Sequence, residues 1–509
     1  YEETGDKKAL TAAEKLADYF LQYFGPGKLE FWPSDLRAPE NKQKHLDGHS
    51  DFAGHSVHYS WEGTLLCDPI TRLYELTGKK KYLEWSQWVV SNIDKWSGWD
   101  AFSRLDSVAD GTLGVDKLQP YVHSHTFHMN FMGFLRLYRI TGDKTLLRKV
   151  SGAWDDIHER QMYITGGVSV AEHYEHDYVK PLSGNIVETC ATMSWMQLTQ
   201  QLLELTGESK YADAMERLMI NHVFAAQDCE SGVCRYHTAP NGSKPDGYFH
   251  GPDCCTASGH RIISILLDDL INKSQKGKEF YINQYMPSQY TGKDFAFEIT
   301  GNYPESENMQ LTIVSEKAKN KTLNLRIPSW CEHPEIKVNG ENIADVKPGA
   351  YLKLSRKWTK GDKVSITFPM EEKWVSRSHH SKYVSYKLAG GEIMYKEEPT
   401  DRIPYAFVRG PIVYSLDMVW NKQLCNDDVN MDQDIRMNTT MKPTLINKPD
   451  NNMLGPVYQT KALYKGSEVD VILTPFANIG QWFRPDGIKP QKYANAFTYG
   501  IWLYNIGTK

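Results

Sequence analysis

Long apolar runs are absent from this chain of 509 residues. None approaches the roughly 18 residues that a transmembrane helix needs, and the mean hydropathy is −0.53. A basic excess is also absent, because 58 Lys and Arg stand against 63 Asp and Glu and the net charge is −5. This balance argues against a nucleic-acid-binding protein, which should carry many more basic residues. Cysteine is scarce, with eight in so long a chain, and this excludes a disulfide framework.

A recognisable targeting segment is lacking as well. The chain begins at Tyr1 without Met, and its first residues resemble the middle of a helical pattern. We interpret this start as processed or trimmed, so the missing leader does not argue against export. Our expectation is a periplasmic or secreted protein, with a cytoplasmic one as the alternative.

Aromatic residues are abundant, at 12% of the chain with 14 Trp and 29 Tyr. Flat aromatic rings suit stacking on sugar rings, but large protein cores use them too. The aromatic content therefore favours a carbohydrate ligand only modestly.

A Thr-Gly repeat organises the first half of the chain. It occurs at Thr4, Thr77, Thr141 and Thr206, in each case next to segments with apolar residues at three- and four-residue steps. Gly directly after a periodic segment is the expected helix C-cap, because it accepts a left-handed backbone. We therefore predict successive helical hairpins in residues 1–275, forming an (α/α)6-type helical toroid. A closed toroid of six hairpins needs more helices than the roughly eight predicted here, so we expect N-terminal helices to be missing.

The hydrophobic period changes to two after a last helix predicted at His260–Lys273. Segments such as MQLTIV, TLNLRI and KVSITF alternate, with turn signals such as Asn339-Gly340 between them. Residues 276–509 are therefore predicted to form a β-sandwich region, with room for two sandwiches. The polar, unperiodic stretch 421–452 is predicted to be a long loop. The fold class is multidomain α+β.

Two cysteine-bearing segments precede predicted helices and form a candidate metal site. Glu188 and Cys190 come first, and the adjacent pair Cys254 and Cys255 comes later. Neighbouring cysteines bridge each other only with strain, so a metal or a reactive thiol is the better interpretation of the pair. Helix N-termini favour thiolates, and three thiolates with one carboxylate complete a tetrahedral zinc site. The alternative is that Cys190 and Cys255 are small buried apolar residues.

The remaining cysteines carry weaker signals. Cys229 and Cys234 are four residues apart and suggest a local disulfide, plain thiols or a second metal half-site. Cys67, Cys331 and Cys425 are predicted to be structural.

An acid-rich loop and two histidine clusters supply candidate catalytic and binding groups. The loop before Cys190 contains Glu172, and a glycosidase needs one carboxyl held protonated to donate to the leaving oxygen. For any one acid in this loop, a solvated surface charge is the competing interpretation. His123 and His125 lie at the start of a predicted helix. An earlier cluster, His45, His49, His55 and His58, precedes another predicted helix. We expect hydroxyl binding by one or two of these histidines, while HxH spacing also permits zinc ligation.

Several of these motifs, taken in order, resemble glycoside hydrolase family 127, the β-L-arabinofuranosidase type. The shared motifs are ITGG at 164–167, Glu172, the Glu188-Thr189-Cys190 triplet, the Cys254-Cys255 pair, LRIPSWC and FVRGPIVYSLD. Each is weak alone, but their order and the Glu-Thr-Cys plus Cys-Cys combination are specific. The likeness covers most of the chain.

The resemblance implies roles for particular residues. It implies a zinc ion held by Glu188, Cys190, Cys254 and Cys255, with Cys254 as nucleophile and Glu172 as acid/base. It also implies sugar contacts from Glu216, Tyr236 and His123 or His125. The activity implied is a retaining exo-glycosidase acting on plant-type glycans. The expected partners are an oligosaccharide or glycoside and, as one option, a second copy of the chain, but no nucleic acid and no membrane.

Two other classes stay open. A polysaccharide lyase also combines a toroid with a sandwich, and His125, Tyr236 and Arg261 would then be the actors. A non-catalytic carbohydrate-binding protein with structural zinc is the second, because four protein ligands close a zinc site whether or not it is catalytic.

Overall fold

The computed structural model describes most of the chain. The described residues are 1–28, 64–97, 101–118, 123–170, 172–174, 182–227, 232–243, 254–315, 317–376, 381–387, 393–399, 403–424, 431–449, 451, 453–479 and 498–506. Contacts divide the chain into two compact units. Unit 1 is residues 1–162 with 168–177, and unit 2 is residues 163–167 with 178–509.

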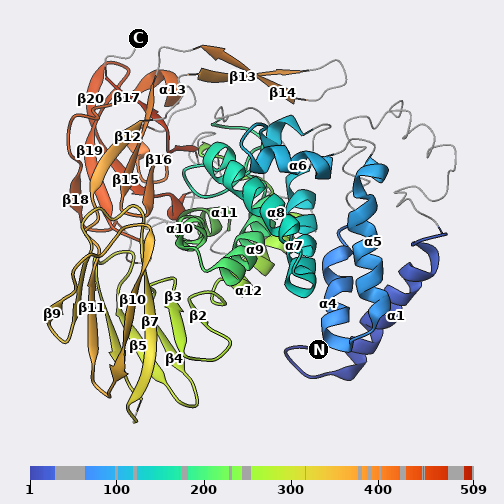
Figure 1. Ribbon diagram of the computed structural model, residues 1–509. Helices are drawn as coiled ribbons and strands as arrows, with labels where there is room; N and C mark the ends of the chain where they lie inside the picture. The colour runs from blue at the N-terminus through green and yellow to red at the C-terminus, as the bar shows by residue number, and fades with distance from the viewer. Residues whose placement is uncertain are drawn as a thin grey trace. The chain divides into compact units, whose positions relative to one another are not determined.

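The helices come first in the chain and follow one another as hairpins (Figure 1). They are α1 (Lys7–Tyr23), α4 (Cys67–Thr77), α5 (Lys80–Ser97), α6 (Ala101–Ala109), α7 (Ser124–Thr141), α8 (Lys144–Asp156), α9 (Thr189–Thr206), α10 (Ser209–Leu218), the three-residue α11 (Phe224–Ala226) and α12 (Cys254–Ile265). A π-helical segment follows both α8 and α10, at Ile157–Gln161 and Met219–Val223. The segments of the predicted repeat therefore form helices in the structure.

The Thr-Gly turns join the two helices of each hairpin, as predicted. Gly78, Gly142 and Gly207 have φ of 69°, 74° and 69°, where a side chain would be strained. The threonine before each glycine uses its hydroxyl twice. Thr141 Oγ1 donates to the Leu137 carbonyl at 2.8 Å and accepts from the Asp143 N–H at 3.2 Å. The same pair of bonds recurs at Thr77 and Thr206, which explains why Thr precedes Gly at all three turns.

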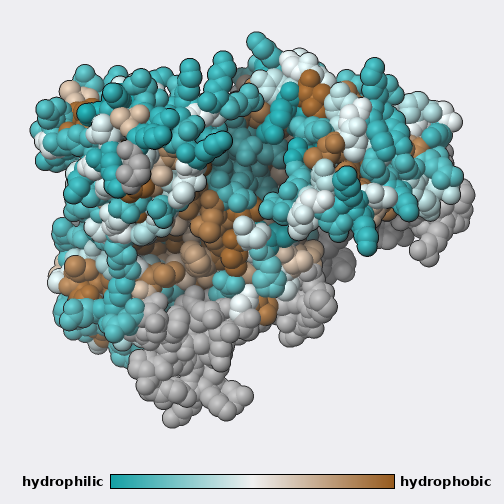
Figure 2. Space-filling view, turned by 90° about the horizontal axis from the view of Figure 1, so that it is seen from below, coloured by the Kyte–Doolittle hydropathy of each residue, from teal (hydrophilic) through white to brown (hydrophobic). Residues whose placement is uncertain are grey.

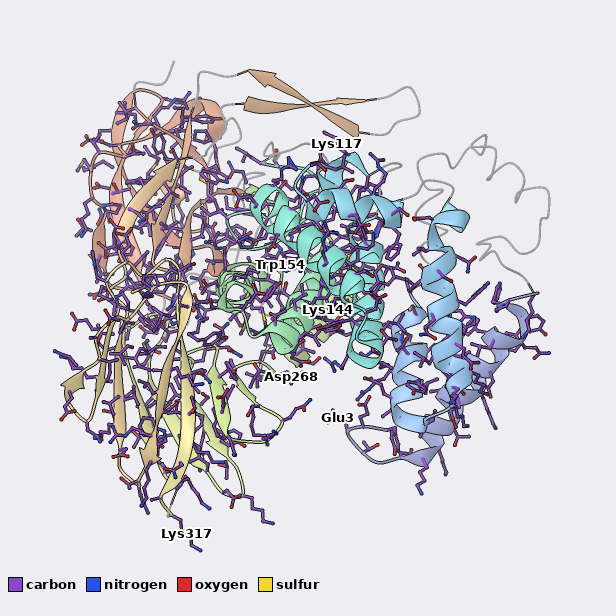
Figure 3. The ribbon with its side chains drawn as sticks, viewed as in Figure 1. Glu3, Lys117, Lys144, Trp154, Asp268 and Lys317 are labelled. Carbon is purple, nitrogen blue, oxygen red and sulfur yellow. The ribbon has the colours of Figure 1, made fainter. Side chains whose placement is uncertain are left out.

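The helices differ in how much of their surface is buried. Eleven of the 18 residues of α7 and twelve of the 18 residues of α9 are buried. The hairpin partner of α7, α8, buries only five of its 13 residues along the usual single apolar stripe. The partner of α9, α10, is itself mostly buried, with seven of its ten residues. In α8, for example, Trp154 is fully buried whereas Lys144 is exposed (Figure 3). The α7–α8 hairpin thus pairs a mostly buried helix with a one-sided one, which is typical of a toroid wall.

The outer surface is polar. Figure 2 shows hydrophilic side chains over much of the face in view, with smaller hydrophobic areas among them. Within the described ranges, no helix combines the length and the apolar character that crossing a bilayer requires.

Most strands follow the helices, and the predicted period-two segments are all found among them, together with strands that were not predicted. They are β1 (Asn241–Ser243), β2 (Ile271–Lys273), β3 (Glu279–Ile282), β4 (Ser288–Thr291), β5 (Ala296–Gly301), β6 (Asn308–Ile313), β7 (Lys319–Ile327), β8 (Glu335–Val338), β9 (Glu341–Asn342), β10 (Ala350–Trp358), β11 (Lys363–Thr367), β12 (Glu372–Ser376), β13 (Ser381–Lys387), β14 (Ile393–Pro399), β15 (Pro404–Arg409), β16 (Ile412–Asp417), β17 (Ile435–Met437), β18 (Thr444–Ile446), β19 (Val457–Tyr464), β20 (Ser467–Pro475), β21 (Thr498–Gly500) and β22 (Leu503–Tyr504).

Two sheets make the first sandwich. One has the order β10-β7-β3-β2 and the other β4-β5-β6-β11-β8-β9. Alternate residues of both sheets meet in one core, which includes Phe297, Leu325 and the fully buried Trp358. A third sheet of ten strands, with the central order β1-β21-β16-β20-β19-β17, has cores of its own. The β region thus contains the first sandwich and a separate ten-stranded sheet with cores of its own, while a second sandwich stays a prediction.

Two boundary predictions were wrong. The last helix, α12, covers Cys254–Ile265 instead of His260–Lys273, and residues 271–273 form β2 in register with β3, Ile271 opposite Ile282. Stretch 421–452 is not one loop, since it contains a short helix (α13, Met431–Asp434) and the strands β17 and β18. Both strands pair with β19, and strands of three residues are too short to show a period.

Asp269 lies in the turn between α12 and β2, where only 1% of it is exposed. Burial raises the pKa of its carboxyl to about 7. Its Oδ1 accepts a hydrogen bond from Asn272 Nδ2 at 2.9 Å, which an asparagine in its place would also accept.

Asp269→Asn should therefore change how stability depends on pH. The pKa of this group is raised in the folded state above its usual 3.8, so wild type loses stability as pH rises from 3.8 towards 7, by up to ~1.4 kcal/mol per pH unit. The variant lacks this loss. Urea unfolding of both chains at several pH values between 4 and 8 measures it, and parallel curves would contradict the assignment.

Candidate metal centre and the Glu172 cluster

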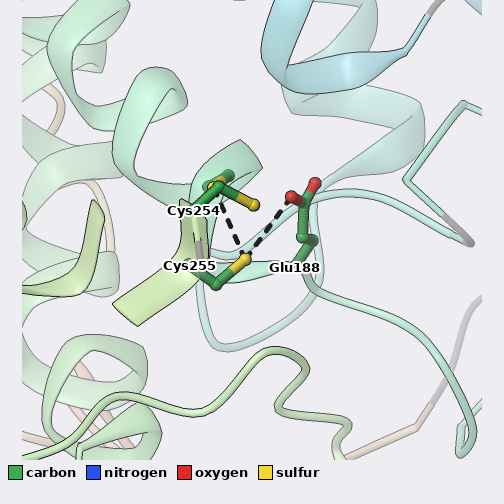
Figure 4. Close-up of side chains that lie close together, drawn as sticks. Glu188, Cys254 and Cys255 are labelled. Atoms are coloured by element: carbon green, nitrogen blue, oxygen red, sulfur yellow. Dashed lines mark hydrogen bonds between the residues drawn. The ribbon is translucent and has the colours of Figure 1, made fainter. Parts of the chain in front are cut away.

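Four predicted ligands come together in unit 2. The donor atoms of Glu188, Cys190, Cys254 and Cys255 all lie within 4.8 Å of one another. Figure 4 shows Glu188, Cys254 and Cys255 close together. The Cys255 Sγ lies 3.4 Å from the Cys190 Sγ and 3.5 Å from Glu188 Oε1. Glu188, Cys190 and Cys255 are buried, whereas Cys254 is exposed. One sulfur of the cluster is thus accessible, while the other three groups are enclosed.

The start of α9 explains how Glu188 and Cys190 converge although they are two residues apart. Glu188 is the N-cap residue and its backbone is still extended, with φ −66° and ψ 138°. The preceding Val187 has φ 55°, a strained value for a β-branched residue. Backbone bonds to a neighbouring segment hold this geometry, from Thr189 N to the Tyr236 carbonyl at 2.9 Å and from Thr238 N to the Val187 carbonyl at 3.1 Å.

The other two ligands form the first turn of α12. A glycine in this helix, Gly259, allows it to lie against Cys234, because a Cβ at Gly259 would stand 2.2 Å from the Cys234 Sγ. The same Cβ would be 3.6 Å from Thr189 Cγ2, in the first turn of α9. Both ligand pairs thus lie at the start of a helix, where the free N–H groups and the helix dipole favour thiolate.

The thiols differ in acidity. A hydrogen bond from Cys255, together with others from Ser258 and Cys254, lowers the pKa of Cys190 to about 6. Burial and then the negative charge of Cys190 raise the pKa of Cys254 to about 11. The hydrogen bond to Cys190 also raises the pKa of Cys255. These shifts favour the thiolate at Cys190 and the protonated thiol at Cys254 and Cys255, and a bound cation would displace the remaining protons.

The donor set fits zinc. Zn²⁺ prefers thiolate, imidazole and carboxylate ligands in tetrahedral sites, with sulfurs roughly 3.8 Å apart for Zn–S bonds of about 2.3 Å. Three sulfurs and one carboxylate at the separations given above need only small shifts to meet one ion. That zinc is the ion bound stays a prediction.

Glu172 lies in unit 1, in a tight turn closed by Val170 and His173. Its φ is 67°, a left-handed value that costs a non-glycine residue about 1–3 kcal/mol. Its carbonyl accepts bonds from the N–H and the hydroxyl of Ser124, at 2.7 and 2.8 Å. The side chain is 33% exposed and its Oε2 lies 3.3 Å from His123 Nε2. Strain of this kind clusters at functional sites and supports a role for Glu172.

His123 is the N-cap of α7 and has a defined orientation. Its Nδ1 accepts from the Thr126 N–H at 3.3 Å, so the neutral ring carries its proton on Nε2, facing Glu172. The His125 ring lies 6.2 Å from that of His123, and His173, which the sequence did not single out, lies 5.9 Å from it. The structure therefore places His123, and not His125, directly against the carboxylate.

Glu216 and Tyr236 occupy different surroundings in unit 2. Glu216 in α10 is 1% exposed and accepts from Trp330 Nε1 at 2.9 Å, from Tyr303 and from Arg326. These bonds connect α10 to the first sandwich. Tyr236 is partly buried, and its backbone carbonyl positions Thr189 next to the ligands. Sugar contact by these residues stays a prediction.

The remaining cysteines contribute no further cluster among the described residues. Cys234 is a buried thiol that packs on Gly259, and Cys67 and Cys331 are buried thiols. The described ranges do not include Cys229, Cys425, His45, His49, His55 and His58.

Helical hairpins, a β-sandwich and a Glu–Cys₃ cluster define a class of toroid-plus-sandwich proteins with a thiol-rich ligand site. The model of the beta-L-arabinofuranosidase GH127 catalytic domain matches residues 53–267, and that of the GH127 middle domain matches residues 279–370. The chain belongs to glycoside hydrolase family 127.

Comparison with individual proteins agrees with this family. The non-reducing end beta-L-arabinofuranosidase of Bifidobacterium longum subsp. longum is 24% identical over 471 residues, which are 83% of this chain and 64% of that protein. The chain thus spans less than two thirds of this relative's length.

Solved structures show the same fold. A GH127 beta-arabinofuranosidase superposes with a TM-score of 0.72 at 22% identity, over 99% of this chain and 74% of its own. The GH127 beta-L-arabinofuranosidase of Geobacillus stearothermophilus T6 gives 0.67 at 22% identity, over 99% and 77%. The predicted helical toroid followed by a β-sandwich is confirmed.

Gly259→Ala should disrupt the ligand cluster. The new Cβ would overlap Cys234, so α12 must move away from the segment that carries Cys234, and the Cys254-Cys255 pair moves with it. We expect a loss of stability of about 1–3 kcal/mol, as for other overpacked cores, and weaker metal binding. Thermal unfolding and zinc titration measure the two effects. The new Cβ would also stand 2.3 Å from the Cβ of Cys234, so only glycine at position 234 removes the overlap. The double variant Gly259→Ala with Cys234→Gly should recover part of both, and no recovery would contradict the packing argument.

Proposed function

We propose that this chain is a retaining exo-glycosidase that removes terminal β-L-arabinofuranose from plant-type glycans. The observation that carries the proposal is the meeting of Glu188, Cys190, Cys254 and Cys255 in a family 127 catalytic domain, with Cys254 as the exposed sulfur. The sugar is suggested by the names of the relatives, which are beta-L-arabinofuranosidases.

The burial of each ligand indicates its role in the cluster. Glu188, Cys190 and Cys255 are enclosed and would hold Zn²⁺, while Cys254 would both ligate it and face the substrate. When bound, the ion keeps its ligand sulfurs deprotonated at neutral pH. With metal bound, Cys254 would therefore be a thiolate that can act as nucleophile. Without metal, the raised pKa of Cys254 would leave its thiol protonated.

In the first step the Cys254 sulfur attacks the anomeric carbon as the bond from that carbon to the leaving oxygen breaks. Glu172 gives its proton to the leaving oxygen, and a thioglycosyl intermediate forms on Cys254. In the second step Glu172 takes a proton from water, whose oxygen attacks the same carbon and releases the thiolate. Two displacements give net retention.

His123 would position Glu172 for both steps. Its Nε2–H faces the carboxylate at 3.3 Å, while its Nδ1 is held by the α7 backbone. We propose that His123, His125 and Tyr236 also contact sugar hydroxyls. For Glu216, all its described bonds are to protein groups, so it would act by holding Trp330 and Tyr303 in place.

Structural zinc in a non-catalytic carbohydrate-binding protein is the second candidate. It is favoured by one observation, namely that the four protein ligands leave no vacant position on a tetrahedral ion. A lyase would instead release a product that absorbs in the ultraviolet. A panel of p-nitrophenyl glycosides that includes β-L-arabinofuranoside separates these classes.

Cys254→Ser and Glu172→Gln should each lower kcat on p-nitrophenyl β-L-arabinofuranoside by at least 10³-fold, because one lacks the nucleophile and the other the acid/base. Glu172→Gln should also accumulate a pentosyl adduct on Cys254, visible by mass spectrometry of the intact chain, since the second step lacks its base. Cys331→Ala, which removes a buried thiol of the sandwich, is the matched control. Full activity of Cys254→Ser would exclude its role as nucleophile.

Cys190→Ser should remove the metal. This residue is the most acidic thiol of the cluster and a buried ligand, so its hydroxyl replacement leaves an incomplete donor set. Elemental analysis should give about one zinc per wild-type chain and a small fraction of that in the variant. Equal zinc content in both chains would contradict the ligand assignment.

A further inference from the structure

A hydrogen-bond relay leads from the ligand cluster to the surface of α12. Ser258 Oγ lies 3.2 Å from the Cys190 Sγ, and Arg261 Nη2 lies 2.9 Å from Ser258 Oγ. Cys254, Cys255, Ser258 and Arg261 share one face of α12, at three- and four-residue spacing. Ser258 is fully buried, whereas Arg261 is exposed. Ser258 thus connects the Cys190 sulfur with the guanidinium of the solvent-exposed Arg261.

The direction of each bond follows from the groups involved. A guanidinium can only donate, so Ser258 Oγ accepts from Arg261. A metal-bound Cys190 is a thiolate and can only accept. The Ser258 hydroxyl must then donate a hydrogen bond to the Cys190 sulfur. The bond from Arg261 leaves the other lone pair of the Ser258 oxygen directed away from that sulfur.

The net charge of the metal-bound cluster explains what this relay would do. Three thiolates and one carboxylate around a divalent cation leave a net charge of −2 in a site where three ligands are buried. Buried charge without compensation is costly. A hydroxyl that is polarised by a guanidinium spreads part of that charge towards Arg261. Because Arg261 is itself exposed, its charge is not desolvated.

We propose that Ser258 and Arg261 are positioning residues that orient the Cys190 sulfur towards the metal. Groups that donate to metal ligands in this way typically change metal affinity 10–100-fold when removed. The inference rests on the metal site proposed above. It assigns a function to Ser258 and Arg261 in the Thr-Ala-Ser-Gly-His-Arg segment that follows the cysteine pair. Packing alone would not require these two residues.

Purified holoenzyme and cobalt-substituted protein provide the test. Ser258→Ala should lower the affinity for Zn²⁺ 10–100-fold in a competition titration with a chelating dye. It should also move the sulfur-to-cobalt charge-transfer band to longer wavelength, because a thiolate without its hydrogen bond gives up electrons more easily. Arg261→Met, which keeps the length of the side chain but no donor, should shift both in the same direction by less.

Ser264→Ala is the matched control. Ser264 lies on the same helix, and its hydroxyl donates to the Arg261 carbonyl at 2.8 Å instead of to a ligand. Its affinity and its cobalt spectrum should equal those of wild type. Arg261→Met covers the case in which Ser258→Ala fails to fold, since its side chain is exposed.

The outcomes separate the two proposals. A wild-type chain that binds no Zn²⁺ or Co²⁺ overturns the metal site and the relay together. Tight binding by wild type, with the same affinity and the same band in Ser258→Ala and Arg261→Met, overturns the relay alone. A drop in affinity without a shift of the band assigns Ser258 to packing and also overturns the proposal.

Discussion

The close approach of the first turns of α9 and α12 is the constraint on which the site in unit 2 depends. Each helix by itself carries only two of the four ligands, and neither pair is a metal site. The approach requires Gly259, whose missing side chain admits Cys234, and Thr189, whose hydroxyl donates to the Arg235 carbonyl at 2.5 Å. Small residues and backbone bonds therefore decide whether three sulfurs and a carboxylate meet at all.

Local strain accompanies this arrangement. Val187 and Glu172 both have left-handed backbones, although neither is a glycine, and both are held there by hydrogen bonds from neighbouring segments. Such conformations persist only where surrounding structure outweighs their cost. Val187 directs Glu188 into the cluster, and Glu172 presents its carboxylate to His123. Strain is thus present in each unit next to the group to which chemistry is assigned.

The buried ion pair of Glu216 and Arg326 shows a different use of charge. Arg326, in β7, is fully buried, and it also binds Asp213 of α10. A charge in such a place must be paired, because an unpaired one would be strongly destabilising. The pair therefore fixes α10, and with it the hairpin that begins at α9, against the first sandwich. This connection was invisible in the sequence, where the partners are 110 residues apart.

How much the sequence determines differs between levels of structure. The helical hairpins, their Thr-Gly turns and the strands of the sandwich follow from local periodicity and from the φ that glycine permits, so they were predictable. The four ligands were named from helix starts and from a family likeness. Their separations, the exposure of Cys254 and the bond of His123 to Glu172 come from packing between distant segments. So do the end of α12 at Ile265 and the strands within 421–452, because β2, β17 and β18 exist only through their partners. Periodicity records which face of a segment is buried, whereas tertiary contacts alone decide against what it is buried.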